Sequence, residues 1–111
     1  NLYNNCRLVI SPATYESSSL PILESCKIGR PVICSDIKPN LELNKRLKLN
    51  IFKTKNVNSL SKILLRVWFN KKLLKSQINF NKRKINEFNW LKVSLKYEKI
   101  FNTLNRKNVN I

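Results

Sequence analysis

Along the first third of the chain, the apolar positions predict two short buried strands joined by a helix. The runs at 7–11 (RLVIS) and 31–35 (PVICS) are apolar and β-branched, as expected of strands in the middle of a parallel sheet. Between them the spacing becomes helical from Leu20, with Ser19 as the expected N-cap. Gly29, the only glycine, fits the left-handed position that ends a helix. A strand–helix–strand order predicts parallel strands with a right-handed crossover.

The rest of the chain predicts one more strand and a series of helices. After a turn-rich segment at 36–40, we expect a short strand near 49–54 and an amphipathic helix from Val57. Helical spacing continues over 71–86. A last helix is expected after Asn89, its N-cap, with one apolar face made of Trp90, Val93, Tyr97, Ile100, Phe101 and Leu104.

Positive charge is confined to the second part of the chain. Residues 1–42 carry four basic and four acidic side chains, whereas residues 43–111 carry 18 basic and two acidic ones and so hold the whole net charge of +16. A basic surface for nucleic acid or anionic lipid is one interpretation. The other is coding bias, because Lys, Asn and Ile, all with A- and T-rich codons, make up 44 of the 111 residues.

Composition excludes several kinds of chemistry. The chain has no His, which excludes Ser-His-Asp catalysis and His-based metal sites within this segment. Cys6, Cys26 and Cys34 are odd in number, form no CxxC and lie among apolar residues, which favours reduced thiols in the cytosol. No apolar run is long enough to cross a bilayer. Because the chain has no Met and opens like the end of a helix, we expect a C-terminal fragment.

The stretch YESSSLPILES, residues 15–25, places Glu16 and Glu24 eight positions apart around a helix start. In an open α/β sheet, ligands bind beyond the carboxyl ends of the strands, and free N–H groups at a helix start attract phosphate. Glu24 follows roughly 7 Å further along the axis at ~1.5 Å per residue, where a carboxylate can bind sugar hydroxyls. This pattern favours a nucleotide sugar. The alternative is that Glu16 caps a turn and Glu24 is a solvated helix residue.

The first 37 residues resemble the donor-binding half of family 4 glycosyltransferases of the GT-B fold. That family's usual pattern is PSxYEGFGLPxLEAMACGxPVIAS; Glu16 and Glu24 fall on its two glutamates, and Leu20-Pro21 on its LP. Gly29–Ile33 matches GxPVI. The resemblance implies a Rossmann-like parallel sheet with flanking helices, forming the C-terminal part of a GT-B enzyme.

The resemblance also implies roles for individual residues. Glu16 would be the catalytic residue that contacts the donor sugar near the reacting centre, and Glu24 would hold the ribose hydroxyls. Glu42 matches a less specific glutamate of the loop after the second strand. The diphosphate would be bound by the segment Ser17, Ser18, Ser19 and Leu20. The three serines replace two glycines and a phenylalanine of the family, which reduces backbone freedom and adds hydroxyl donors, so the choice of donor is open.

The resemblance divides the chain into two parts, residues 1–56 and residues 57–111. Residues 1–56 would form the donor-binding core, a partial Rossmann-like domain. Residues 57–111 would complete it with helices that pack back on an N-terminal domain outside this chain; FNW at 88–90 matches a common FSW before the last helix. The diphosphate-neutralising Arg or Lys pair and the acceptor-binding domain precede this segment in the family, so we expect the segment alone to be inactive.

The implied activity is transfer of a sugar from a nucleotide sugar to an acceptor, with retained configuration and without a metal or other cofactor. The acceptor would be a polysaccharide, a glycolipid, another lipid-linked sugar or a protein. We expect a cytoplasmic enzyme that contacts the inner face of the membrane through residues 43–111, with no nucleic-acid partner. The alternatives are a non-catalytic basic module for nucleic acid or anionic membrane, and a plain flavodoxin-like domain, which has no need of the two spaced glutamates.

Overall fold

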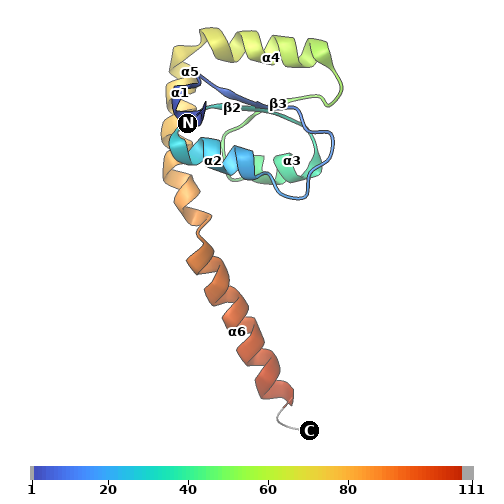
Figure 1. Ribbon diagram of the computed structural model, residues 1–111, viewed down its shortest axis with the longest axis vertical. Helices are drawn as coiled ribbons and strands as arrows, with labels where there is room; N and C mark the ends of the chain where they lie inside the picture. Colours follow the sequence, from blue (N-terminus) through green and yellow to red (C-terminus); the bar gives the residue numbers. More distant parts are fainter. Residues whose placement is uncertain (1, 109–111) are drawn as a thin grey trace.

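Three parallel strands lie at the centre of the structure, a computed structural model that describes residues 2–108 (Figure 1). Their order is β1-β2-β3, with Ile10 opposite Ile33 and Cys34 opposite Ile51. The predicted α/β fold with a parallel sheet and flanking helices is therefore confirmed. In chain order the elements are α1 (Leu2–Asn5), β1 (Val9–Ser11), α2 (Leu20–Ile28), β2 (Val32–Ser35), α3 (Lys38–Asn44), β3 (Asn50–Phe52), α4 (Val57–Phe69), α5 (Lys71–Lys84), the 3-10 turn η1 (Ile85–Glu87) and α6 (Trp90–Asn108).

Helices cover the sheet on both faces, with α4 on one side and α2 and α3 on the other (Figure 1). Because side chains alternate along a strand, β2 sends Val32 and Cys34 towards α2 and Ile33 towards α4. On the α2 side these side chains pack against Ile22. On the α4 side Ile33 packs against Val67. Burial on both faces explains why β2 is continuously apolar.

The first strand is less buried than its sequence predicts. Within residues 2–108, β1 pairs with β2 and has no strand on its other side. Its middle residue, Ile10, is 39 % exposed as a result. The expectation of a buried strand over RLVIS is therefore correct for the strand itself and wrong for the degree of its burial.

Helix α2 begins and ends as the sequence predicts. Ser19 occupies the N-cap position and Pro21 lies in the first turn, where its missing N–H breaks no helical hydrogen bond. Gly29 ends the helix with φ 87° and donates its N–H to the carbonyls of Ser25 and Cys26. This left-handed end turns the chain directly into β2.

Replacing Gly29 by alanine is expected to lower the free energy of unfolding by about 1–2 kcal/mol, because a Cβ is disfavoured at this φ. The three atoms nearest to the added Cβ all belong to the flexible end of the Lys82 side chain, which can move aside. Lys55, with φ 59°, is the matched control. Lys55→Gly should change the same quantity by less than about 1 kcal/mol, since strain relief and lost chain stiffness oppose each other. Denaturant unfolding measures both, and an unaffected Gly29→Ala variant would contradict the account.

Two segments differ from the sequence-based expectation. The turn predicted at 36–40 leads into α3, because Pro39 lies in its first turn and Asn40 bonds back to the carbonyl of Ser35 at 2.9 Å. In α4 the predicted apolar face is only partly covered: Val67 is buried, but Val57 at the first turn is 80 % exposed.

Buried amides, and not only apolar side chains, attach α5 to the sheet. Asn50 of β3 and Gln77 of α5 donate to each other at 3.0 and 2.9 Å. Asn81 accepts from the Lys48 N–H at 2.7 Å and donates to the Lys48 carbonyl at 2.9 Å. These paired bonds satisfy both ends of each amide, so α5 is held in one register.

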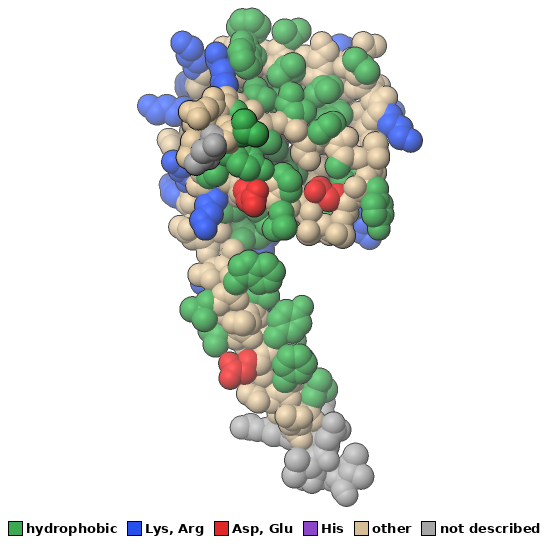
Figure 2. Space-filling view, viewed as in Figure 1, with side chains coloured by type: hydrophobic (Ala, Val, Ile, Leu, Met, Phe, Trp, Pro, Cys, Tyr) green, Lys and Arg blue, Asp and Glu red, His purple; other side chains and the backbone are tan. Residues whose placement is uncertain are grey.

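The last helix, α6, leaves the body of the molecule and extends alone (Figure 1). Asn89 caps it as predicted, accepting from the Leu91 N–H at 2.8 Å. Hydrophobic side chains are exposed along the helix, on both of its edges in Figure 2. Trp90 is 81 % exposed, and Tyr97, Ile100, Phe101 and Leu104 are exposed as well. Within the described residues the predicted apolar side chains are therefore exposed except for Val93, which is half-buried. Residues 109–111 of the predicted segment 57–111 lie outside the described residues.

Candidate functional site

The loop from residue 12 to residue 19 joins the end of β1 to the start of α2. Because Ser11 is opposite Cys34, this loop leaves the sheet beside the carboxyl end of β2. Most of the loop is exposed, but Glu16 is half-buried and Ser19 is buried. The fold thus places Glu16, the serines and the first turn of α2 at the edge of the sheet where α/β proteins bind ligands.

Glu16 has an unsatisfied carboxylate oxygen. Its Oε2 atom is buried and accepts no hydrogen bond from the residues that the structure describes. A buried acceptor without a partner costs about 1–3 kcal/mol, and more when it is charged. A ligand hydroxyl placed at this atom would remove that cost. Glu16 is therefore prepared to accept a hydrogen bond that the protein itself does not supply.

The thiols of Cys26 and Cys34 are buried and protonated at neutral pH. Burial, then Cys26 and Glu16, raise the pKa of Cys34 to about 12, which also places the Glu16 carboxylate near β2. Burial raises the pKa of Cys26 to about 11. Cys6 is half-buried, and its thiol donates to the Tyr3 carbonyl at 3.3 Å. The expectation of free thiols is confirmed, with Cys6 less buried than the other two.

At the start of α2, several N–H and hydroxyl donors have no partner within the described residues. The Ser19 hydroxyl does not cap the helix but donates to Oδ1 of Asn40 at 2.6 Å. The N–H groups of Ile22 and Leu23 are used by the Ser19 carbonyl. Within residues 2–108, the N–H groups of the segment 17–20 have no partner, and neither do the hydroxyls of Ser17 and Ser18. An anion at this point would meet several donors and the positive end of the helix dipole.

Glu24 is exposed on α2 and faces a groove of about 480 Å³. Burial, followed by a hydrogen bond with Glu24 and the Glu24 charge, raises the pKa of Tyr3, so Tyr3 of α1 lies against this carboxylate. Glu16 does not line the groove. The two glutamates therefore flank the first turns of α2 without sharing one cavity. The groove is lined by Leu20, Leu23, Glu24, Lys27, Ile85, Asn86, Phe88, Asn89 and Trp90.

Two further carboxylates, Glu42 and Asp36, already have partners within the protein. Glu42 lies in α3 and not in a loop, is exposed and pairs with Lys45 at 2.8 Å, and the Lys45 hydrogen bond lowers the pKa of Glu42. Hydrogen bonds from Thr54 lower the pKa of Asp36. The bond from the Thr54 N–H to the Asp36 carboxylate joins the ends of β2 and β3. These contacts leave Glu16 as the carboxylate at this edge with a buried unpaired oxygen.

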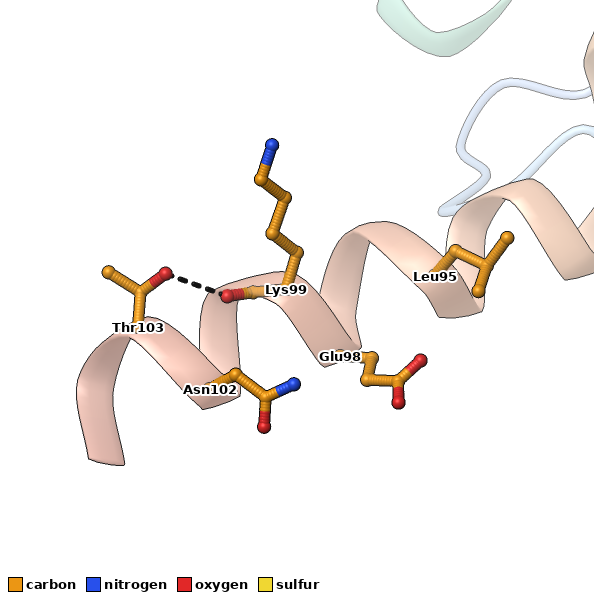
Figure 3. Close-up of a pocket in the computed structure, with 5 residues that line it drawn as sticks. All are labelled: Leu95, Glu98, Lys99, Asn102 and Thr103. Atoms are coloured by element: carbon orange, nitrogen blue, oxygen red, sulfur yellow. Dashed lines mark hydrogen bonds between the residues drawn. The ribbon is translucent and has the colours of Figure 1, made fainter. Parts of the chain in front are cut away.

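A hollow of about 340 Å³ on α6 does not qualify as a site. Figure 3 shows that its five residues all come from α6, with Lys99 pointing to one side of the helix and Glu98 and Asn102 to another. Thr103 donates to the Lys99 carbonyl at 2.8 Å, which is a bond within the helix. No other element of the described chain encloses the hollow.

Two features are absent from residues 2–108. No group of three or more Cys, Asp or Glu side chains is arranged to hold a metal ion. No helix in this range combines the length and the apolar character needed to cross a membrane.

Sequence reasoning missed Asn40 and Ser35, which contact the loop from the ends of α3 and β2. A polar residue after a proline is ordinarily a turn residue, so the sequence held no signal for a buried Asn40.

The chain belongs to the family of glycosyl transferases group 1, whose family model matches residues 1–84. Its fold is that of a GT-B glycosyltransferase. One similar solved structure is a sucrose-phosphate synthase from Thermosynechococcus elongatus, with a TM-score of 0.82 at 18 % identity, covering 96 % of this chain and 27 % of that one. This chain therefore spans about a quarter of the length of that structure. No curated protein matches the chain. The predicted family and fold are confirmed.

Proposed function

We propose that this chain binds the nucleotide-sugar donor of its glycosyltransferase at the start of α2. The observation that carries the proposal is the buried, unpaired Oε2 of Glu16 beside a helix start whose donors are free. A donor would supply what both lack, since its sugar hydroxyls can donate to Glu16 and its diphosphate can accept from the N–H groups of 17–20. Glu24, on the next turns of α2, then accepts from the ribose hydroxyls.

In this arrangement the residues act on different parts of the donor. The N–H groups and the dipole of α2 stabilise the negative charge that grows on the leaving diphosphate. Glu16 contacts the sugar close to the carbon at which transfer occurs. Glu24 binds the nucleoside and is remote from the reacting bond. Transfer retains the anomeric configuration, and the donor is the substrate of a reaction that uses no cofactor.

The complete enzyme contains more than this segment. The exposed face of α6 packs on an N-terminal domain that binds the acceptor, a polysaccharide, a glycolipid, another lipid-linked sugar or a protein. Basic residues of the second part of the chain contact the inner face of the membrane, and the enzyme is cytoplasmic. The isolated segment binds donor weakly and transfers nothing.

Turnover by the complete enzyme is expected to be unchanged by a chelator, because helix dipole and cationic side chains replace a metal at the diphosphate. Rates with excess EDTA and with added Mg²⁺ or Mn²⁺ should agree within about twofold, a difference of about 0.4 kcal/mol in the barrier. The control is a metal-dependent transferase in the same assay. Loss of activity that only Mg²⁺ or Mn²⁺ restores would contradict the proposal.

Donor binding is expected to depend only weakly on salt. Nucleic-acid binding through many phosphates falls steeply with log salt concentration, whereas binding of a single diphosphate releases few counterions. Calorimetry with a nucleoside diphosphate at 50 and 200 mM NaCl should give affinities within about threefold of each other. A loss of about a thousandfold for a nucleic acid, with no diphosphate binding, would instead favour a basic binding module.

A further inference from the structure

The loop segment 14–18 carries Glu16 and is fixed only by hydrogen bonds of the residues that flank it. None of its residues forms a hydrogen bond with any part of the chain that the structure describes. The nearest attachments are Ala13 on one side and Ser19 on the other. A short exposed segment without hydrogen bonds of its own samples many conformations unless its ends are fixed. The two attachments therefore decide where Glu16 lies.

Both attachments lead to one buried pair, Ser35 at the end of β2 and Asn40 in the first turn of α3. The Ser35 hydroxyl donates to the Ala13 carbonyl. Asn40 accepts from the Ser19 hydroxyl at 2.6 Å and donates to the Ser35 carbonyl at 2.9 Å. Asn40 and Ser35 are 0 % exposed, and Ser19 is 4 % exposed. The three side chains thus form a closed polar cluster beneath the loop.

We propose that Asn40 is a positioning residue of the donor site, an inference that rests on the proposed function. By holding Ser19, it fixes the direction of the N–H groups that receive the diphosphate. By holding Ser35, it also supports the Ala13 end of the loop that carries Glu16. Groups fixed before binding lose less entropy when the ligand arrives, so affinity is higher.

Asn40 acts on the loop more than on helix α2. When its side chain is removed, the Ser19 hydroxyl and the Ser35 carbonyl lose a buried partner. The N–H groups of Ile22 and Leu23 still donate to the Ser19 carbonyl, and neither bond involves Asn40. The first turn of α2 therefore keeps its hydrogen bonds, but the loop loses its attachment to α3.

The test is Asn40→Ala in the complete enzyme, with calorimetry against a nucleoside diphosphate and ligand-observed NMR with the nucleoside alone. Diphosphate affinity is expected to fall roughly tenfold or more. Nucleoside affinity, which depends on Glu24 in α2, should stay the same. The control is Asn44→Ala in the same helix, because Asn44 accepts from the Leu49 N–H at 3.0 Å and does not contact the loop. Asn44→Ala should leave both affinities unchanged.

Equal diphosphate affinities for wild type and Asn40→Ala, measured well below the melting temperature of each, would overturn the positioning role alone. Absence of diphosphate binding by the wild type would overturn the proposed function and this role with it. If Asn40→Ala does not fold, Ser35→Ala replaces it. This variant removes the bond to the Ala13 carbonyl and the long 3.4 Å bond from the Asn40 amide, and it keeps the Asn40 bond to the Ser35 carbonyl. Its kcat should fall more than its diphosphate affinity, and an unchanged kcat would overturn the inference.

Discussion

Replacing Glu16 by glutamine in the complete enzyme is expected to lower kcat roughly a hundredfold, the size of effect that follows loss of one transition-state contact. Affinity for the nucleoside diphosphate should stay nearly unchanged, because that ligand lacks the sugar that Glu16 contacts. The melting temperature should stay the same or rise. A neutral amide costs less to bury than the unpaired carboxylate oxygen that it replaces.

This combination separates a binding group from a structural one. A glutamate that stabilised the fold would lower the melting temperature when replaced, whereas Glu16 is predicted to lower only the rate. Glu87→Gln is the control, because Glu87 pairs with Arg46 and Lys84 at the surface and lies outside the site. Steady-state rates, calorimetry and thermal unfolding are compared for the three proteins. A Glu16→Gln enzyme with full activity and reduced stability would contradict the assignment.

Replacing Glu24 by alanine is expected to weaken binding of both the free nucleoside diphosphate and the complete donor by roughly tenfold to a hundredfold. Each charge-assisted hydrogen bond lost from the ribose contributes ~1.5–3 kcal/mol. The effect appears with the free diphosphate because the ribose is common to both ligands. kcat at saturating donor should change little, since this contact is the same in the ground state and the transition state.

The contact between Glu24 and Tyr3 offers a matched control. Tyr3→Phe removes the hydroxyl that interacts with Glu24 and keeps the aromatic ring, so diphosphate affinity should remain within about threefold of wild type. Calorimetry measures the diphosphate affinity of both variants. Equal affinities for wild type and Glu24→Ala would identify Glu24 as a solvated helix residue, and an exchange of phenotypes between Glu16 and Glu24 would reverse their roles.

The parts of the fold that local signals define could be predicted from the sequence. Helix α2 has Pro21 in its first turn and Gly29 at its end, and both signals depend only on backbone conformation. The apolar run of β2 indicated a strand buried on both faces, as found. Helix α3 was missed because Pro39 and Asn40 are also common turn residues.

The polar interior could not be predicted, because it depends on pairs far apart in the sequence. Asn50 and Gln77 are 27 residues apart, and only their mutual contact makes burial of two amides favourable. The same holds for Asn40, whose partner Ser19 is 21 residues away. The candidate glutamates were found through their spacing, but the unpaired Oε2 of Glu16 follows from how the loop folds over β2.

The most direct measurement is a crystal structure of the complete enzyme with an unreactive, fluorinated nucleotide sugar bound. We expect the diphosphate on the N–H groups of 17–20, a ribose hydroxyl within about 3 Å of the Glu24 carboxylate, and a sugar hydroxyl within about 3 Å of Oε2 of Glu16. A donor bound elsewhere, with Oε2 of Glu16 still unpaired and the start of α2 empty, would contradict this expectation.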